Sequence, residues 1–242
     1  MSKAFVSQWD SDHFGFKVAK LTVSSSEEIL PSLEFCMKQE VVLLICRCDT
    51  ADIPSVHLME QLGFLLMDTI MNSCIDLTTW KMPSTADLSG IRWHSEDDIG
   101  AITAIAEKAF TGYISHFHKD PRLAQDKCDS LYVQWAYNSC YDTNLASGMV
   151  VAELEGEVVG FLSIVPPSGG RGDFGIGAMD PKAQGKGIFP KLYYFSFDWL
   201  KTEGVKWVQD KTVVNNYAEL KVLIKVGMRP FESLYTFHKW LR

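Results

Sequence analysis

Two glycines separated by one lysine lie between a predicted strand and a predicted helix, in the stretch AQGKGIF at residues 183–189. The strand ends near Met179, and the run 188–203 has the apolar spacing of a helix. A helix start leaves backbone N–H groups unpaired and carries the positive end of the helix dipole. Glycine permits positive φ and a close approach of a diphosphate, and Lys186 adds a positive charge. The stretch therefore predicts a diphosphate-binding loop, with an ordinary turn before a helix as the alternative.

Strands and helices alternate around this loop. The patterns predict strands at 91–93, 148–153, 158–165, 171–179 and 206–211, one or two strands within 229–241, and helices at 97–110, 123–141, 188–203 and 217–226. The turn Glu155-Gly156-Glu157 favours an antiparallel hairpin between two of the strands. This order predicts an α/β (α+β) fold in which helices flank a mixed central sheet.

A cluster of Pro, Ser, Thr and Gly at residues 81–90 separates two periodic regions and indicates a linker. Laying Gly63 on Gly227 aligns residues 57–77 with residues 221–241, so that helix end, glycine and strand match in register. Helix–glycine–strand transitions are common, so chance is one explanation, and a partial copy of one fold is the other. We predict a partial domain at 1–80, a linker at 81–90 and a complete domain at 91–242.

Charge and composition exclude several classes of partner. The net charge of −7, with Lys+Arg 23 against Asp+Glu 30, disfavours nucleic acid. No run approaches the roughly 18 apolar residues of a membrane span, and the N-terminus has no apolar signal core. Only Cys46 and Cys48 are close among the cysteines, and no second pair stands at zinc spacing. We therefore expect free buried thiols in a reducing cytoplasm and no metal.

At these residues the chain resembles the GCN5-related N-acetyltransferases (GNAT), in which a Q/R-x-x-G-x-G/A loop holds the pyrophosphate of acetyl-CoA. QGKGI at 184–188 is similar to the variant Q-G-x-G-I, and AMDP at 178–181 is similar to the end of the family's fourth strand. NNYAELKVLIKVGM at 215–228 is similar to the family's N-x-x-A-x-x-x-Y-x-x-x-G-F stretch. The resemblance covers residues 91–242 and implies a GNAT fold and acetyl-CoA (CoA) as co-substrate. The cofactor-binding residues that it implies are Ala178, Met179, Gln184, Gly185, Lys186, Gly187, Ile188 and Asn216.

Stretches at 9–16, 114–123 and 129–139 resemble the dTDP-fucosamine (dTDP-4-amino-4,6-dideoxygalactose) acetyltransferase group, which has an additional partial acetyltransferase fold at its N-terminus. The resemblance implies a small-molecule primary amine as acceptor, specifically a nucleotide-linked amino sugar. The chain departs from the family at Leu223, where a tyrosine usually acts as general acid. It departs from the subgroup at Ser115-His116-Phe117, where S-R-F is often found. The first departure keeps open the alternative of a CoA-binding sensor or pseudo-enzyme.

Transfer to an amine needs a group that removes a proton and is helped by a group that protonates the departing thiolate. Tyr217 is the hydroxyl nearest in sequence to the missing acid, and Tyr235 is a second candidate for which a core position is the alternative. His116, His118 and Asp120 form a loop cluster of candidate bases, among which we select His116; solvent-facing side chains are the alternative. Metal binding by the two histidines lacks a third ligand.

Two groups of aromatic residues allow more than one interpretation. Trp9-Asp10 either contacts substrate or belongs with Phe14 and Phe16 to a small apolar cluster, which we favour. The helix at 188–203 carries aromatic residues on nearly all sides. This favours packing on the sheet with some surface left for a second copy, so a homodimer is open.

Overall fold

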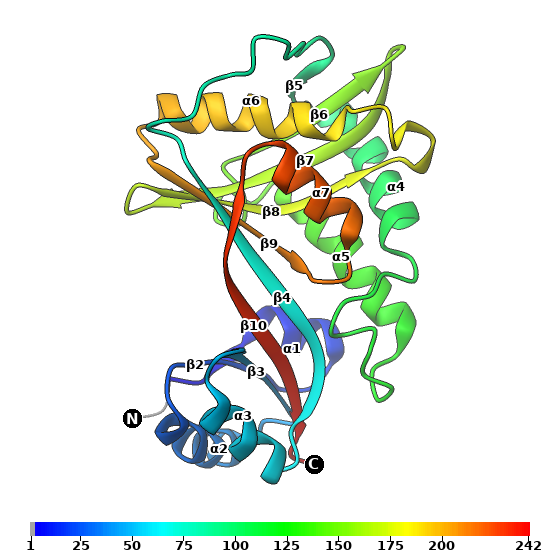
Figure 1. The fold of residues 1–242 in the computed structure, drawn as a ribbon. Helices are drawn as coiled ribbons and strands as arrows, with labels where there is room; N and C mark the ends of the chain where they lie inside the picture. The colour runs from blue at the N-terminus through cyan, green and yellow to red at the C-terminus, as the bar shows by residue number, and fades with distance from the viewer. Residues whose placement is uncertain (1–2) are drawn as a thin grey trace.

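The structure, a computed structural model, describes residues 3–242. Within these residues the strands form one ten-stranded sheet in the order β1-β2-β3-β10-β4-β9-β8-β7-β6-β5 (Figure 1). The strands are β1 (Phe5–Ser7), β2 (Val18–Val23), β3 (Leu43–Asp49), β4 (Leu65–Asp76), β5 (Ile91–Trp93), β6 (Gly148–Leu154), β7 (Glu157–Ser168), β8 (Arg171–Met179), β9 (Trp207–Val213) and β10 (Arg229–Trp240). The α-helices are α1 (Gln8–Phe14), α2 (Ile29–Lys38), α3 (Ile53–Gln61), α4 (Ile99–Phe110), α5 (Gln125–Ser139), α6 (Phe189–Thr202) and α7 (Tyr217–Lys225). Short 3₁₀ helices cover 26–28, 96–98 and 181–183.

The predicted mixed α/β fold is confirmed, and most predicted elements are found within two residues of their expected ends. β5 and β8 have the predicted bounds, and α6 begins one residue later than predicted, at Phe189. The region after Arg229 is one long strand rather than two. Its position could not be read from the sequence, because β10 pairs with β3 on one side and with β4 on the other.

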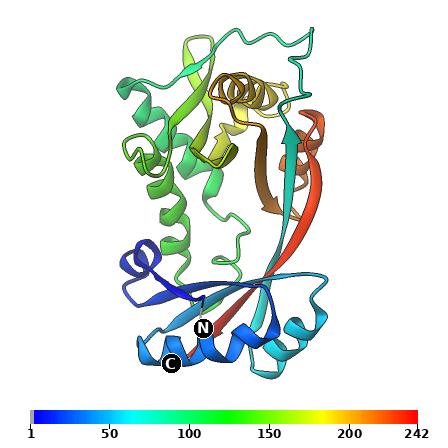
Figure 2. The ribbon, with the colours of Figure 1, turned by 90° about the vertical axis from the view of Figure 1, so that its left-hand side faces the viewer.

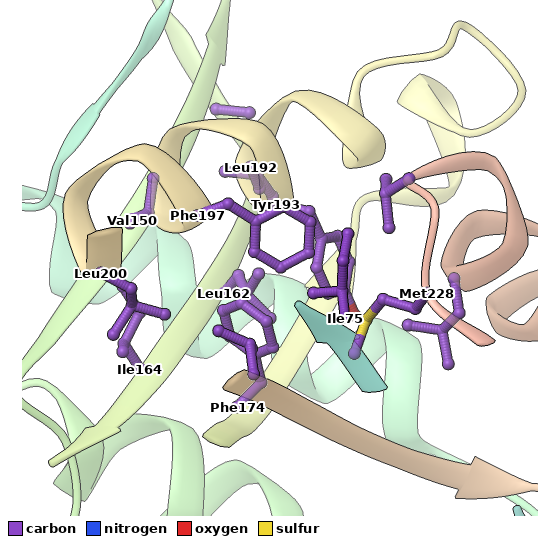
Figure 3. Close-up of a cluster of buried hydrophobic side chains, with 14 of the residues drawn as sticks. Ile75, Val150, Leu162, Ile164, Phe174, Leu192, Tyr193, Phe197, Leu200 and Met228 are labelled. Carbon is purple, nitrogen blue, oxygen red and sulfur yellow. The ribbon is translucent and has the colours of Figure 1, made fainter. Parts of the chain in front are cut away.

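Helices cover both faces of the C-terminal part of the sheet. On one face, α6 packs its aromatic residues onto β7 and β8 (Figure 3), and the rings of Tyr193 and Phe174 lie 4.9 Å apart. On the other face, α4 and α5 contact β7 and β8. These helices hold β8 in place from both sides, and the 3₁₀ helix at 181–183 joins the end of β8 to the QGKG loop (residues 184–187).

The long strands β4 and β10 run side by side from the N-terminal part to the C-terminal part of the sheet (Figures 1 and 2). β4 comes from the N-terminal half of the chain, yet it lies between β9 and β10. Residues 77–90 contain no helix or strand, and Lys191 anchors this segment through Asp87 at 3.2 Å. The predicted linker at 81–90 therefore separates two parts of the sequence, but the sheet continues across both parts. That the two parts are independent domains stays a prediction.

The internal sequence similarity has a counterpart in strand pairing. The offset of 164 residues between Gly63 and Gly227 carries the bounds of β3 onto those of β9, and the bounds of β4 onto those of β10. β4 and β10 pair with each other, and Ile70, which corresponds to Leu234 in the repeat, is also its strand partner. β10 pairs with β3 in the same register in which β4 pairs with β9. This symmetric register favours a duplicated unit over a chance match.

Three further expectations concern the whole chain. The cysteines are free as predicted; Cys36, Cys46, Cys48 and Cys128 are buried, whereas Cys74 and Cys140 are partly exposed. The outer aromatic residues of α6 are partly covered by their own chain, because Phe195 and Trp199 pack edge-on against Trp93 at 5.4 and 5.1 Å. The homodimer stays a prediction without that support. Among the described residues, no helix combines the length and the apolar character needed to cross a bilayer.

Candidate active site

One cavity has a volume of about 490 Å³ and is lined by residues of both halves of the chain. Its C-terminal end lies between β8 and β9, where residues 174–177 and 210–213 form opposite walls. Its other end reaches the sheet face formed by β2, β3 and β4, and residues 113–117 of the α4–α5 connection close one side. Neither half of the chain encloses this cavity alone.

Strands β8 and β9 separate inside the cavity. They pair in parallel only through residues 171–173 and 207–209, and no pairing between them continues beyond. A β-bulge in β8 accompanies the separation: Gly175 and Ile176 stand opposite the single residue Ser163 of β7, whose hydroxyl accepts a hydrogen bond from Ile176 N at 2.7 Å. A bulge bends its strand and re-aims it. The gap between β8 and β9 is suited to an extended ligand that supplies its own hydrogen-bonding groups.

The QGKG loop has the backbone that its glycines predict. Gly185 and Gly187 have φ values of 75° and 73°, in the left-handed region that favours glycine. A Cβ on Gly185 would meet no atom within 4 Å, so glycine is favoured here by the backbone conformation and not by crowding within the chain. The Nζ of Lys225 lies 3.9 Å from the position that a Cβ on Gly187 would occupy, which brings a cation besides Lys186 to the loop. These features fit an anion at the start of α6.

Three more of the predicted cofactor-binding residues lie on the cavity wall or next to it. Asn216 caps α7, accepts a hydrogen bond from Glu219 N at 3.3 Å and lines the cavity. Ala178 and Met179 are buried at the end of β8, one and two residues beyond the cavity wall at Gly177.

His116 is the last member of a buried chain of hydrogen-bonding side chains. Its Nδ1 lies 2.8 Å from Nε2 of His238, whose Nδ1 lies 2.7 Å from Oδ2 of Asp120. The same carboxylate oxygen accepts a hydrogen bond from Trp240 Nε1 at 2.8 Å. A carboxylate only accepts, so His238 donates from Nδ1, and neutral His238 accepts from Nδ1 of His116. This assignment leaves the lone pair on Nε2 of His116.

The surroundings keep His116 neutral. Burial is the first cause that lowers its pKa well below the usual range, followed by the adjacent titratable ring of His238 and the positive charges of Arg47 and Lys20. Burial raises the pKa of Asp120, but hydrogen bonds from His238, the Arg122 amide and Trp240 outweigh it and lower that pKa. A neutral imidazole that is linked through His238 to a carboxylate, and whose Nε2 is free, can accept a proton at Nε2.

A second titratable cluster lies at the C-terminal end of the cavity. The hydroxyl of Tyr193 lies 2.6 Å from Asp210 Oδ2 and 2.5 Å from Glu219 Oε1. Tyr193 has one hydroxyl proton, which serves one of the two contacts, so a carboxyl group must supply a proton to the other. Burial and the adjacent Asp210 raise the pKa of Glu219 to about 8, and burial raises that of Asp210 to about 6. The pair thus shares one extra proton at neutral pH, and we assign it to Glu219, whose pKa is raised further.

Several sequence expectations about side chains need correction. His116, His118 and Asp120 are not solvent-facing: His118 is held by Ser115 Oγ at 2.8 Å and by Asp129 at 3.0 Å. Trp9 lies on the cavity wall, apart from the stacked pair of Phe14 and Phe16. The prediction that Trp9 belongs to one apolar cluster with Phe14 and Phe16 is therefore wrong.

Tyr217 is 68% exposed and is not on the cavity wall, and a catalytic role for it stays a prediction without support from its position. Leu223 is 1% exposed and belongs to the core. His238, Asp210 and Glu219 were missed. The only sequence signal for His238 and Asp210 is that each is a polar residue within a predicted strand. Glu219 has a clearer signal, because it stands where the N-x-x-A pattern has alanine.

Comparison with known proteins identifies the family. A family model described as an acetyltransferase (GNAT) domain matches residues 90–229, more than half of the chain. The chain belongs to the GNAT acetyltransferase family. It is an N-acetyltransferase, as predicted. Among the described residues, no group of three or more His, Cys, Asp or Glu side chains is arranged to hold a metal ion.

Relatives of this GNAT enzyme include a curated protein and many solved structures. The spore coat polysaccharide biosynthesis protein SpsD of Bacillus subtilis (strain 168) is 25% identical over 210 residues, which is 83% of this chain and 68% of SpsD. A GCN5-related N-acetyltransferase from Sphaerobacter thermophilus is similar with a TM-score of 0.65 at 17% identity, covering 99% of this chain and 76% of that one. A tandem GNAT protein from the clavulanic acid biosynthesis pathway has a TM-score of 0.55 at 12% identity, covering 92% and 75%. At these identities the structural matches establish the fold.

Proposed function

We propose that this GNAT enzyme transfers an acetyl group directly to a primary amine held in the cavity, with acetyl-CoA as the donor. One observation carries the proposal: the gap between β8 and β9 and the side chain of His116 line the same cavity. An acetyl donor in the gap and an amine beside His116 would be held close together in one cavity. Their reaction would then no longer depend on a bimolecular encounter in solution.

The residues around the gap fit CoA, which supplies the acetyl group as a thioester when bound. Loop residues 184–188 would hold the pyrophosphate on backbone amides, with Lys186 and Lys225 nearby. Asn216 and the end of β8 at 178–179 would contact the extended arm. The bulge and the separated strands leave room for that arm.

The proton movements are assigned to two groups that line the cavity, His116 and Glu219. The amine nitrogen forms the new bond to the acetyl carbon and gives its proton to Nε2 of His116, whose ring is held in place by the hydrogen bond to His238 and, beyond it, Asp120. The carbon–sulfur bond breaks, and the sulfur takes the proton that Glu219 holds. Glu219 lies one helical turn before Leu223 and would replace the tyrosine that the family usually has there.

The finer assignment of the acceptor as a nucleotide-linked amino sugar has two sources of support. One is the resemblance of residues 9–16, 114–123 and 129–139 to the dTDP-fucosamine acetyltransferase group. The other is the polysaccharide biosynthesis named for SpsD. His116 itself is the position that departs from the subgroup's S-R-F, so the acceptor need not be the subgroup's own sugar.

A CoA-binding sensor without turnover is the second candidate, because Leu223 is a core residue that cannot donate a proton. A mass-shift screen separates the two functions. The protein is incubated with acetyl-CoA and a panel of amines, amino sugars, sugar nucleotides and peptides, and a gain of 42 Da, about the mass of an acetyl group replacing one hydrogen, is sought. We expect acetylation of at least one amine, at a rate that His116→Ala lowers. CoA binding with no acetylated product across the panel favours the sensor.

A further inference from the structure

A row of polar side chains crosses the sheet at the N-terminal end of the cavity. Thr236 of β10 pairs with Arg47 of β3 on one side and with Asp68 of β4 on the other. Directly opposed residues of neighbouring strands project from the same face of a sheet, so the three side chains are neighbours. Arg47 and Asp68 line the cavity, whereas the opposite face of these strands packs on the core formed with α2 and α3.

Asp68 is buried without a hydrogen-bond donor. The residue as a whole is only 5% exposed, and neither oxygen of its carboxylate has a hydrogen-bond partner among residues 3–242. The same holds for Oγ1 of Thr236, which is fully buried. A buried carboxylate without donors is costly, and native proteins retain few such groups without a reason. A donor from outside the chain would satisfy Asp68.

Arg47 presents the opposite charge to the same space. No hydrogen bond and no ion pair within 4 Å involves its guanidinium among the described residues, although the charge of Asp68 acts on it. Lys20 and Lys211 line the cavity as well, and Lys20 is paired with Asp10 at 2.5 Å. Burial lowers the pKa of Lys211, and the positive charges of Arg47 and Lys20 lower it further. Cations that repel one another around a cavity are stabilised by a bound anion.

We propose that Arg47 and Asp68 form the acceptor-binding subsite, and that the acceptor is a phosphate-bearing amino sugar. Its phosphate binds Arg47, whose planar guanidinium matches phosphate oxygens, and its hydroxyl groups donate to Asp68, while the amine faces Nε2 of His116. The rings of Trp9 and Trp135 on the cavity wall offer apolar surface to the sugar ring. The proposal rests on the acetyl-transfer function proposed above and adds the groups by which the acceptor is recognised.

Calorimetric titration of the protein without acetyl-CoA tests binding separately from transfer. The probes are glucosamine 1-phosphate, glucosamine and glucose 1-phosphate. We expect glucosamine 1-phosphate to bind at least about 10-fold more tightly than either of the others. Arg47→Gln lowers its affinity to that of glucosamine. Lys38→Gln, which removes an exposed positive charge on α2 at the opposite face of the sheet, changes nothing. Equal affinity for glucosamine with and without phosphate, no binding of any probe, or no effect of Arg47→Gln overturns the proposal.

Asp68→Asn supplies a readout that a purely structural role would not share. Because Asp68 makes no hydrogen bond in the free protein and its buried charge is costly there, we expect a Tm no lower than that of the wild type. The Kd values for glucosamine 1-phosphate and for glucose 1-phosphate, which share their other hydroxyl donors, both rise at least about 10-fold. A lower Tm with unchanged Kd contradicts the subsite. Retained probe binding with no acetylated amine in the mass-shift screen contradicts the proposed function alone.

Discussion

Ile70 and Leu234 face each other across β4 and β10, and they are also equivalent residues in the internal repeat. A pair that is both equivalent and directly opposed marks the position of a two-fold relationship between the halves of the chain. The last strand of each half is thereby inserted next to the strand of the other half, β4 beside β9 and β10 beside β3. Because this exchange of strands brings the two halves together, residues of both halves line the cavity.

The exchange of strands predicts that the C-terminal fragment will not fold alone. Residues 91–242 without β4 leave β9 and β10 with unpaired edges, and exposed edges promote association. We expect the fragment to aggregate in size-exclusion chromatography and to recover cooperative unfolding when residues 1–90 are co-expressed. A monomeric 91–242 fragment with a cooperative thermal transition would show instead that the domain boundary predicted from the sequence is a folding boundary.

Gly185→Val tests the diphosphate loop. Valine at a φ of 75° costs about 1–2 kcal/mol and places a branched side chain where the loop would meet phosphate. Gly204→Val is the matched control, because Gly204 has a φ of 78° with no atom within 4 Å of a Cβ, at the far end of α6. We expect similar losses of Tm in both variants and a Kd for CoA at least about 10-fold higher only in Gly185→Val. Equal Kd values in the two variants contradict the loop assignment.

The protonated Glu219 predicts a specific pH dependence of stability. Its pKa is about 8 in the folded protein, above the ordinary value of 4.5, so the folded state binds more protons than the unfolded state between these values. The free energy of unfolding therefore falls as the pH rises from about 4.5 to about 8. Glu219→Gln, which cannot ionise, should flatten this decline in chemical unfolding curves. A pH dependence identical to that of the wild type would mean that Glu219 is ionised in the folded protein.

Asp120→Asn tests the orientation of the two histidines. Asparagine can donate to Nδ1 of His238 and so favour the tautomer that donates from Nε2, which reverses the hydrogen bond to His116. We expect kcat to fall on the order of 100-fold with KM nearly unchanged. Asp129→Asn serves as the control, since Asp129 contacts His118 outside the chain of three residues. Similar kinetic losses in both variants would assign Asp120 to the general structure of the loop.

The sequence predicted the parts of this molecule that depend on local pattern. The QGKG loop, the glycine that ends α7 and most strand bounds follow from residue type and spacing over a few positions. The site also depends on pairing between distant segments, which spacing does not encode. His238 reaches His116 because β10 crosses between β3 and β4, and Asp68 reaches the cavity because β4 lies beside β9. His116 was found from its neighbours in sequence, whereas its partner, 122 residues away, was not.

The rate of acetyl transfer at saturating acetyl-CoA, measured in His116→Ala and Tyr217→Phe with the amine that the screen identifies, tests the account most directly. Loss of the base should lower the rate by about 10²–10⁴-fold while CoA affinity is retained, and the rate of Tyr217→Phe should equal that of the wild type because this tyrosine lies outside the cavity wall. An undiminished rate in His116→Ala would contradict the account.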